Sequence, residues 1–276
     1  MNFNIFVYQK KIKVISCVIL TIVVLGLLYI AFLKLNTNKH SSISKDEIVT
    51  KLEDLSHSDP KINEILNNID RYPDKYLELL SKNIETINFV LNYPNHTSKS
   101  NSKKASIEEY YTPGEIPLFL QWDKNWGYDM YGEDPIAIDG CAPTSLAMVA
   151  VGLTGNTSVT PLSVSDYAYK NGYYIDGVGS SWSLISEGSK HFGLKSHELP
   201  LNKSSILSTL ESGNPIILTV GPGTFTSTGH FLVLTGLTDD GKIKINDPNS
   251  KLNSSKSWDV DIFLNETKNL WKISKL

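Results

Sequence analysis

The sequence predicts an α+β protein in which helices come first and a domain of mixed helices and strands follows. Apolar residues recur at helical spacing between residues 41 and 94. A buried helix is expected after Gly140, and two strands that form a hairpin are expected before Asp247. Helices and antiparallel strands that occupy separate segments of a chain are typical of the α+β class.

Residues 14–33 form an uncharged apolar stretch rich in Val, Ile and Leu. A helix of this length spans about 30 Å, the thickness of a bilayer's hydrocarbon core, so we expect a single transmembrane anchor. Lysines at positions 10, 11 and 13 place residues 1–13 in the cytoplasm and the rest of the chain outside the cell, at the cell membrane. The alternative is a cleaved signal peptide, which has a shorter apolar core and ends in small residues.

Residues 41–94 are expected to form a helical stalk. Ile48 and Leu52 fall on one face of a helix, and Pro60 and Pro73 mark the starts of two others. The stalk either packs on itself or on the next domain, which is the more ordinary case, or it binds a partner or gates access. Residues 95–110 are polar and predict an exposed linker, so the folded domain comprises residues 111–276.

The composition allows one globular domain with accessory segments. The chain has 276 residues, 41% apolar content and a net charge of −3, and without a basic face we expect no nucleic-acid partner. Its two cysteines are Cys17, inside the apolar stretch, and Cys141, so no disulfide framework is expected. The histidines lack metal-ligand spacing, and we expect neither a metal site nor a cofactor.

Cys141 stands at the predicted N-terminus of a buried helix that ends near Gly152 or Gly155. Pro143 fits the first turn of this helix. The positive end of the helix dipole favours a thiolate there. A cysteine is more often a small buried apolar residue. This one would be a free thiol in an oxidising compartment, so we interpret it as a nucleophile.

His230 stands at the entrance of one predicted strand, and Asp247 ends the next. An Asp-Asp-Gly turn signal at residues 239–241 predicts that the two strands form a hairpin. Because side chains alternate along strands, an even loop puts Asp247 on the face of His230, and a four-residue loop puts it opposite Leu232. The carboxylate can then orient the imidazole. An odd loop would turn Asp247 away and bring Asn246 to that face.

Residues 116–273 resemble the peptidase-C39-like domains, papain-fold relatives of the double-glycine peptidases that process bacteriocins. The resemblance implies a papain-like α+β fold, with Cys141 on a helical lobe that faces an antiparallel sheet carrying His230 and Asp247. It also implies that Gln121 donates a hydrogen bond to the oxyanion. The bacteriocin-processing enzymes are fused to an exporter with an ATPase domain, and this sequence has no Walker motif, so double-glycine specificity is not implied. The motifs are Gln121-Trp122-Asp123, Gly140-Cys141-x-Pro143-Thr144-Ser145, Gly229-His230-Phe231-x-Val233-Leu234 and Asn246-Asp247-Pro248.

The predicted function is an extracytoplasmic cysteine peptidase that cleaves a peptide or protein through a thioester acyl-enzyme. One alternative is a hydrolase or acyltransferase that acts on cell-wall peptides with the same triad. Another is a non-catalytic peptide-binding module on the same fold, against which the set of Cys141, His230, Asp247 and Gln121 argues. The substrate and the oligomeric state stay open.

Overall fold

The computed structural model describes residues 43–96 and 107–276. Lys45–Leu276 forms one compact unit. The predicted anchor at residues 14–33 lies outside the described residues. Among the helices of the described ranges, none combines the length and the apolar content that crossing a bilayer requires.

Residues 43–96 form a cluster of short helices, which we call the helical segment. Helix α2 packs on α3 and α4, and α5 packs on α3 and α4. Apolar stripes meet at these contacts, where Ile48, Leu52 and Leu77 are fully buried. Pro60 and Pro73 immediately precede α3 and α4, where a missing N–H leaves no helical hydrogen bond unmade. The elements are α2 (Lys45–Ser56), α3 (Lys61–Leu66), η1 (Ile69–Arg71), α4 (Asp74–Lys82), η2 (Ile84–Thr86), α5 (Ile87–Asn92) and η3 (Tyr93–Asn95).

The rest of the described chain contains further helices, several of them short. The longest is α7, which carries Cys141 at its first position. The elements are η4 (Glu108–Tyr110), α6 (Ile136–Asp139), α7 (Cys141–Thr154), α8 (Pro161–Lys170), α9 (Ser183–Ser186), η5 (Gly188–Phe192), α10 (Lys203–Glu211), α11 (Lys251–Ser254) and α12 (Val260–Glu266).

In the described residues, an antiparallel sheet has the strand order β5-β10-β6-β7-β8-β9. Two small ladders join β1 to β2 and β3 to β4. Helices combined with an antiparallel sheet confirm the predicted α+β class. The strands are β1 (Met130–Tyr131), β2 (Asp134–Pro135), β3 (Tyr174–Ile175), β4 (Gly179–Ser180), β5 (Leu194–Glu198), β6 (Ile216–Val220), β7 (His230–Leu237), β8 (Ile243–Asn246), β9 (Ser257–Trp258) and β10 (Thr267–Lys275).

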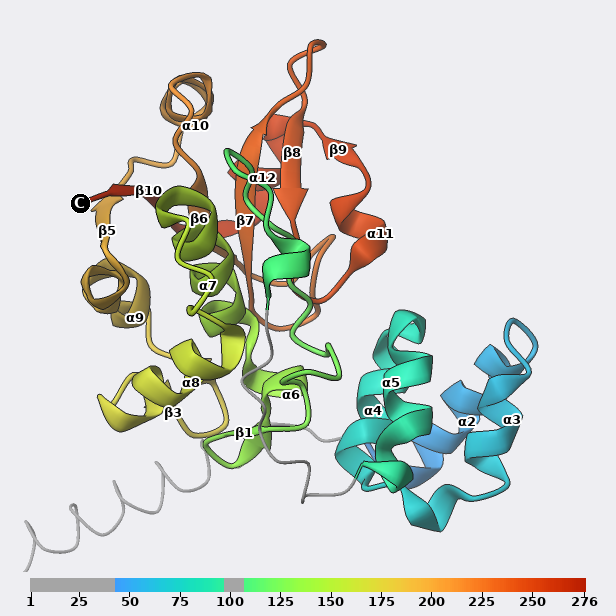
Figure 1. Cartoon of the computed structure of the whole chain (residues 1–276). Helices are drawn as coiled ribbons and strands as arrows, with labels where there is room; N and C mark the ends of the chain where they lie inside the picture. The colour runs from blue at the N-terminus through green and yellow to red at the C-terminus, as the bar shows by residue number, and fades with distance from the viewer. Residues whose placement is uncertain (1–42, 97–106) are drawn as a thin grey trace, which may run out of the picture. The chain divides into compact units, whose positions relative to one another are not determined.

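The large sheet separates two apolar cores, because neighbouring residues of a strand point to opposite faces. Phe231 and Val233 of β7 join the core that contains α7, whereas Leu232 and Leu234 join the core that contains α10 and α12. Helix α7 contacts β7 and β10 and lies across the sheet (Figure 1). Helices on both faces explain why β7 is an almost uninterrupted apolar run.

Helix α7 begins and ends at glycines. Gly140 precedes it, and an added Cβ at this position would lie 2.3 Å from the carbonyl oxygen of Ile136, so the backbone of α6 comes too close for a side chain. Gly155 ends the helix with a φ of 72°, a left-handed conformation that glycine adopts without strain. The prediction of a helix from Cys141 to the vicinity of Gly155 is confirmed.

The β7–β8 hairpin has the odd-length loop that the sequence analysis left open as the second case. Leu237 pairs with Ile243, which leaves a loop of odd length, 238–242. A bulge between Leu234 and Gly236 inserts one extra residue in β7 and shifts the register by one. The expectation that an odd loop turns Asp247 away is therefore wrong, because the bulge restores the register that an even loop would have had.

The physical reason for the odd loop lies in the hydrogen bonds of Thr238. Its hydroxyl oxygen accepts a hydrogen bond from the Lys242 N–H at 2.9 Å, and its own N–H donates to the Lys242 carbonyl oxygen at 2.8 Å. Gly241 takes a left-handed φ of 78° within this turn. Side-chain hydrogen bonds of this kind are a feature of loops that strand alternation does not reveal.

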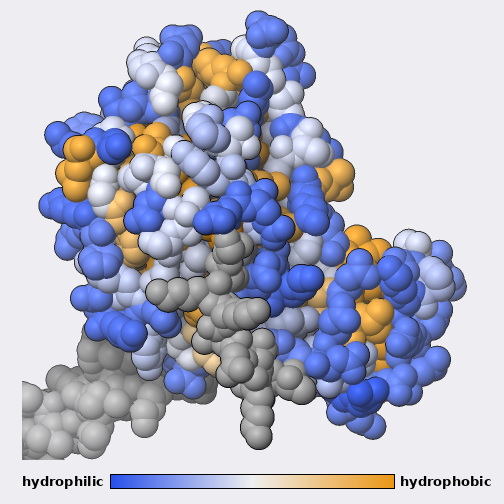
Figure 2. Space-filling model, in the orientation of Figure 1, coloured by the Kyte–Doolittle hydropathy of each residue, from blue (hydrophilic) through white to orange (hydrophobic). Residues whose placement is uncertain are grey.

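The face of the molecule that Figure 2 shows is mostly hydrophilic, with small separate apolar patches. Scattered exposure of large apolar side chains is ordinary for a folded domain, so these residues carry no functional argument. The exposed side chains include Met130, Tyr169, Val178, Trp182 and Leu252.

Candidate active site

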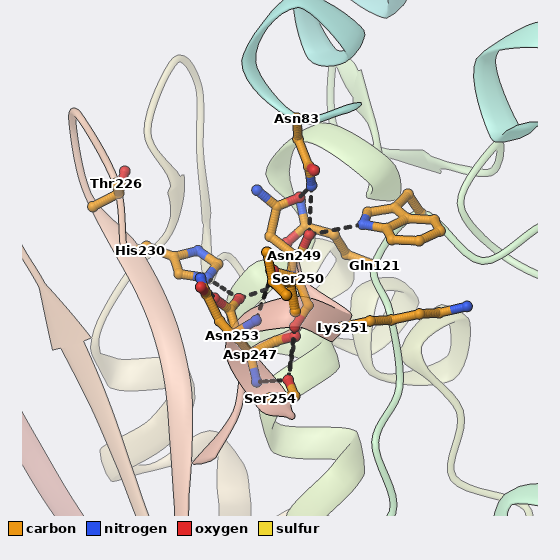
Figure 3. A network of polar contacts seen from close by, with 12 residues as sticks. Asn83, Gln121, Thr226, His230, Asp247, Asn249, Ser250, Lys251, Asn253 and Ser254 are labelled. Atoms are coloured by element: carbon orange, nitrogen blue, oxygen red, sulfur yellow. Dashed lines mark hydrogen bonds and ion pairs between the residues drawn. The ribbon is translucent and has the colours of Figure 1, made fainter. Parts of the chain in front are cut away.

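The structure brings His230 and Asp247 together as a buried pair. His230 is the first residue of β7, and Asp247 directly follows β8, the adjacent strand. The His230 Nε2 atom lies 2.7 Å from Asp247 Oδ1, and both side chains are more than nine-tenths buried (Figure 3). An ionised carboxylate only accepts hydrogen bonds, so Nε2 carries the proton and Nδ1 is left for another partner.

The electrostatics of this pair favour a charged imidazole. Burial lowers the pKa of His230, but the charge of Asp247, the hydrogen bond to it and the contact with Cys141 outweigh burial and raise that pKa to about 10. Burial likewise raises the pKa of Asp247, and the His230 charge together with hydrogen bonds from His230, Asn253 and the Asn249 N–H brings it below its ordinary value. An opposite charge at hydrogen-bond distance stabilises the charged form of each partner.

Cys141 is the third member of the cluster. It is partly exposed at the N-terminus of α7, and its interaction with His230 contributes to the raised pKa of that imidazole. Residue Cys141 is partly exposed, whereas His230 and Asp247 are buried. The site therefore combines a thiol, an imidazole and a carboxylate, which are the groups that acyl transfer by a cysteine uses.

Residues 247–254, which we call the Asp247 loop, hold the carboxylate in place. Asp247 Oδ1 accepts a hydrogen bond from the Asn249 N–H at 2.8 Å, and Oδ2 accepts one from Asn253 Nδ2 at 2.8 Å. The Asp247 N–H donates to the Ser254 hydroxyl oxygen at 2.8 Å (Figure 3). Sequence reasoning missed these partners, although an Asp followed two residues later by a backbone donor is a known turn pattern.

Gln121 contacts α6, the helix directly before α7, and is oriented differently from the expectation. Its side-chain Nε2 donates to the carbonyl oxygens of Ala137 at 2.8 Å and Ile138 at 3.2 Å, both in α6. Within the described residues, Gln121 Oε1 is buried and accepts no hydrogen bond. The amide would have to turn away from α6 before it could donate to an oxyanion.

Within the described part of the chain, no group of three or more His, Cys, Asp or Glu side chains is placed to hold a metal ion.

A comparison with protein families identifies the class of this domain. Residues 114–275 match the model of the Peptidase_C39 like family, and the chain belongs to that family. The resemblance deduced from the motifs is thereby confirmed, and the family supports a hydrolase of the cysteine-peptidase type. The helical segment lies outside the matched residues.

Among solved structures, the chain is similar to the peptidase domain of Streptococcus ComA, a bi-functional ABC transporter involved in a quorum-sensing pathway. The two share 18% sequence identity with a TM-score of 0.39, and the match covers 50% of this chain and 93% of the other. The comparison with curated proteins gives no match.

Proposed function

We propose that this protein is a cysteine peptidase of papain-like fold that hydrolyses a peptide or protein substrate outside the cytoplasm. The proposal rests on the bond of 2.7 Å between His230 Nε2 and Asp247 Oδ1, and on the influence of Cys141 on the pKa of the same imidazole. Membership of the Peptidase_C39 like family supports it independently.

The proposed reaction starts from a Cys141 thiolate paired with protonated His230. The sulfur attacks the carbonyl carbon of the substrate, and His230 gives its proton to the amide nitrogen as the C–N bond breaks. Water then attacks the thioester carbon while His230 takes a proton from it, and the C–S bond breaks, which releases the carboxylic acid and restores the Cys141 thiolate beside protonated His230. Asp247 holds the imidazole with Nδ1 toward the sulfur throughout. In this proposal the oxyanion accepts a hydrogen bond from the Cys141 N–H. It accepts a second one from the side-chain amide of Gln121 once that amide has rotated away from α6.

The test of this function is the reactivity of Cys141 in the full-length protein. An ordinary cysteine thiol ionises at about pH 8.5. We expect iodoacetamide to modify Cys141 at pH values well below this. In a His230→Ala variant this low-pH reaction should disappear, because the cation that stabilises the thiolate is gone. Peptide mass spectrometry separates Cys141 from Cys17. If the pH dependence of Cys141 modification is the same in both proteins, the catalytic function is contradicted. The non-catalytic peptide-binding module is then the better interpretation.

The fate of the acyl group separates a peptidase from an acyltransferase. In water enriched in ¹⁸O, hydrolysis places one ¹⁸O atom in the new carboxylate of a peptide product. A Cys141→Ala variant is the matched control and should release no labelled product. Transfer of the acyl group to an added amine without ¹⁸O incorporation would favour the acyltransferase instead.

We propose the extracytoplasmic location from apolar residues 14–33 and the lysines before them. A membrane-impermeant thiol reagent applied to intact cells should therefore modify Cys141. Modification only after lysis would contradict the proposed orientation.

A further inference from the structure

The helical segment contacts the Asp247 loop through residues 83–85. Asn83 Nδ2 donates to the Asn249 carbonyl oxygen at 2.6 Å, and Asn83 Oδ1 accepts the Glu85 N–H at 3.0 Å. Figure 3 shows Asn83 reaching Asn249 in the same polar network that contains His230 and Asp247. A residue far away in the sequence thus holds the backbone two residues after Asp247.

Glu85 makes the closer set of contacts with this loop. Its carboxylate accepts hydrogen bonds from the Ser250 hydroxyl, the Lys251 N–H at 2.9 Å and the Leu252 N–H at 3.2 Å. The two N–H groups begin α11 and have no partner inside so short a helix. Hydrogen bonds to an ionised acceptor are roughly twice as strong as neutral ones, so Glu85 holds the loop firmly.

The contacts of Glu85 continue to the carboxylate of Asp247. The Ser250 oxygen that donates to Glu85 also accepts the Asn253 N–H at 3.0 Å, and Asn253 Nδ2 donates to Asp247 Oδ2 at 2.8 Å. On the other side, the Asn249 N–H donates to Asp247 Oδ1 at 2.8 Å, and its carbonyl oxygen is the acceptor of Asn83. Both oxygens of Asp247 are therefore bonded to residues that the helical segment holds.

We propose that Asn83 and Glu85 are positioning residues for the active site, so that the helical segment completes the support of the His230–Asp247 pair. The inference rests on the proposed function. Asn83 and Glu85 lie outside the residues that match the family, so this support is an addition to the family domain. If the segment releases the loop, the carboxylate loses its fixed orientation and the imidazole loses its alignment with Cys141.

The experiment compares Glu85→Gln with Glu78→Gln in the full-length protein. Glu78 is a matched control because its carboxylate, in the same segment, pairs with Lys82 at 2.6 Å. We expect Glu85→Gln to lower kcat between about tenfold and about 100-fold with KM nearly unchanged, since misalignment near 1 Å has effects of this size. Glu78→Gln should leave both constants unchanged, and Glu85→Asp should restore part of the lost kcat.

A second measurement does not depend on catalysis. The Nε2 proton of His230 in its bond to Asp247 should give a downfield proton NMR resonance. This resonance should broaden in Glu85→Gln, while the Lys251 and Leu252 amides exchange faster with deuterium. If Glu85→Gln does not fold, Asn83→Ala applies the same test with a smaller change, because it removes the bond to Asn249.

The outcomes separate the two proposals. A resonance and a kcat that both stay at the wild-type value in Glu85→Gln would overturn the positioning role and leave the peptidase function standing. A resonance that broadens in a protein whose Cys141 shows no low-pH reactivity would support the positioning role and contradict the peptidase function.

Discussion

At the scale of single residues, His230 keeps a proton although it is buried. The Asp247 carboxylate, together with Cys141, raises the pKa of the imidazole by more than burial lowers it. In the proposed reaction the same charges serve two purposes, because they stabilise the folded pair and hold the imidazole in the form that protonates a leaving amine. Stability and catalysis should therefore respond together when this pair is changed.

The first prediction concerns the pH dependence of stability. The pKa of His230 is raised from 6.5 to about 10, so the folded state holds an extra proton between these values. The free energy of unfolding should fall as pH rises through this window, because the stabilising proton is lost. In Asp247→Asn the main cause of the raised pKa is gone, and the fall should shrink. Urea denaturation at pH 6.5 and at about pH 10 measures the fall in the free energy of unfolding. An equal fall in the wild-type protein and in Asp247→Asn would contradict the prediction.

A second residue-scale prediction concerns Gln121, whose two possible roles give different results. Gln121→Leu removes the donor to the carbonyl oxygens of Ala137 and Ile138. Loss of these buried bonds should lower the free energy of unfolding by about 1–3 kcal/mol. If the amide also turns to the oxyanion, kcat should fall by a further factor of about 100–1000 with KM unchanged. A variant that is less stable but equally active would limit Gln121 to supporting α6.

The candidate site residues could be chosen from the sequence because each stands at a recognisable boundary. Cys141 follows a glycine at a helix start, and His230 and Asp247 flank two apolar strands. The residues that hold them were not predictable in this way. Glu85 reaches the Asp247 loop across 165 positions of sequence to Ser250, and no local pattern specifies a contact at that separation.

At the scale of elements, the site depends on where α7 begins and on the register of β7 with β8. The start of α7 was predicted from Gly140 and Pro143, on either side of Cys141. The register was predicted only on the condition of an even loop. The observed register depends on a bulge in β7 that compensates for the odd loop. The alternation of apolar and polar residues does not predict where such a bulge occurs.

The prediction at this scale is that Gly140→Ala displaces the start of α7. An added Cβ would lie 2.3 Å from Ile136 O and 2.5 Å from Ile136 Cγ2, so the backbone must move. Crowding of this kind costs about 1–3 kcal/mol. Because Cys141 is the next residue, kcat should fall as well. Leu201→Ala, at an exposed leucine outside the site, is the control. Equal activity of both variants would show that Cys141 tolerates the shift.

At the scale of the whole molecule, the helical segment is more than a spacer between residues 14–33 and the family domain. Tyr128 stacks on Phe89 with ring centroids 4.1 Å apart and donates its hydroxyl proton to the Phe89 carbonyl oxygen at 2.6 Å. Lys75 pairs with Asp134 at 2.6 Å, a surface contact of little energetic weight. With the contacts of Glu85, these interactions join the segment to the domain at three separate places.

The last prediction is that the helical segment and the domain unfold as one cooperative unit. Leu52→Ala, in the segment, removes a fully buried side chain and should cost about 2–5 kcal/mol. All five tryptophans lie between residues 122 and 271, so their fluorescence reports only on the domain. In a single unit, the midpoints from fluorescence and from far-UV circular dichroism should both fall, and by the same amount. Leu201→Ala, at an exposed leucine, should change neither midpoint.

If the fluorescence midpoint of Leu52→Ala stays at the wild-type value while circular dichroism shows an earlier transition, the segment folds by itself. Its hold on the Asp247 loop would then be weaker than the contacts indicate.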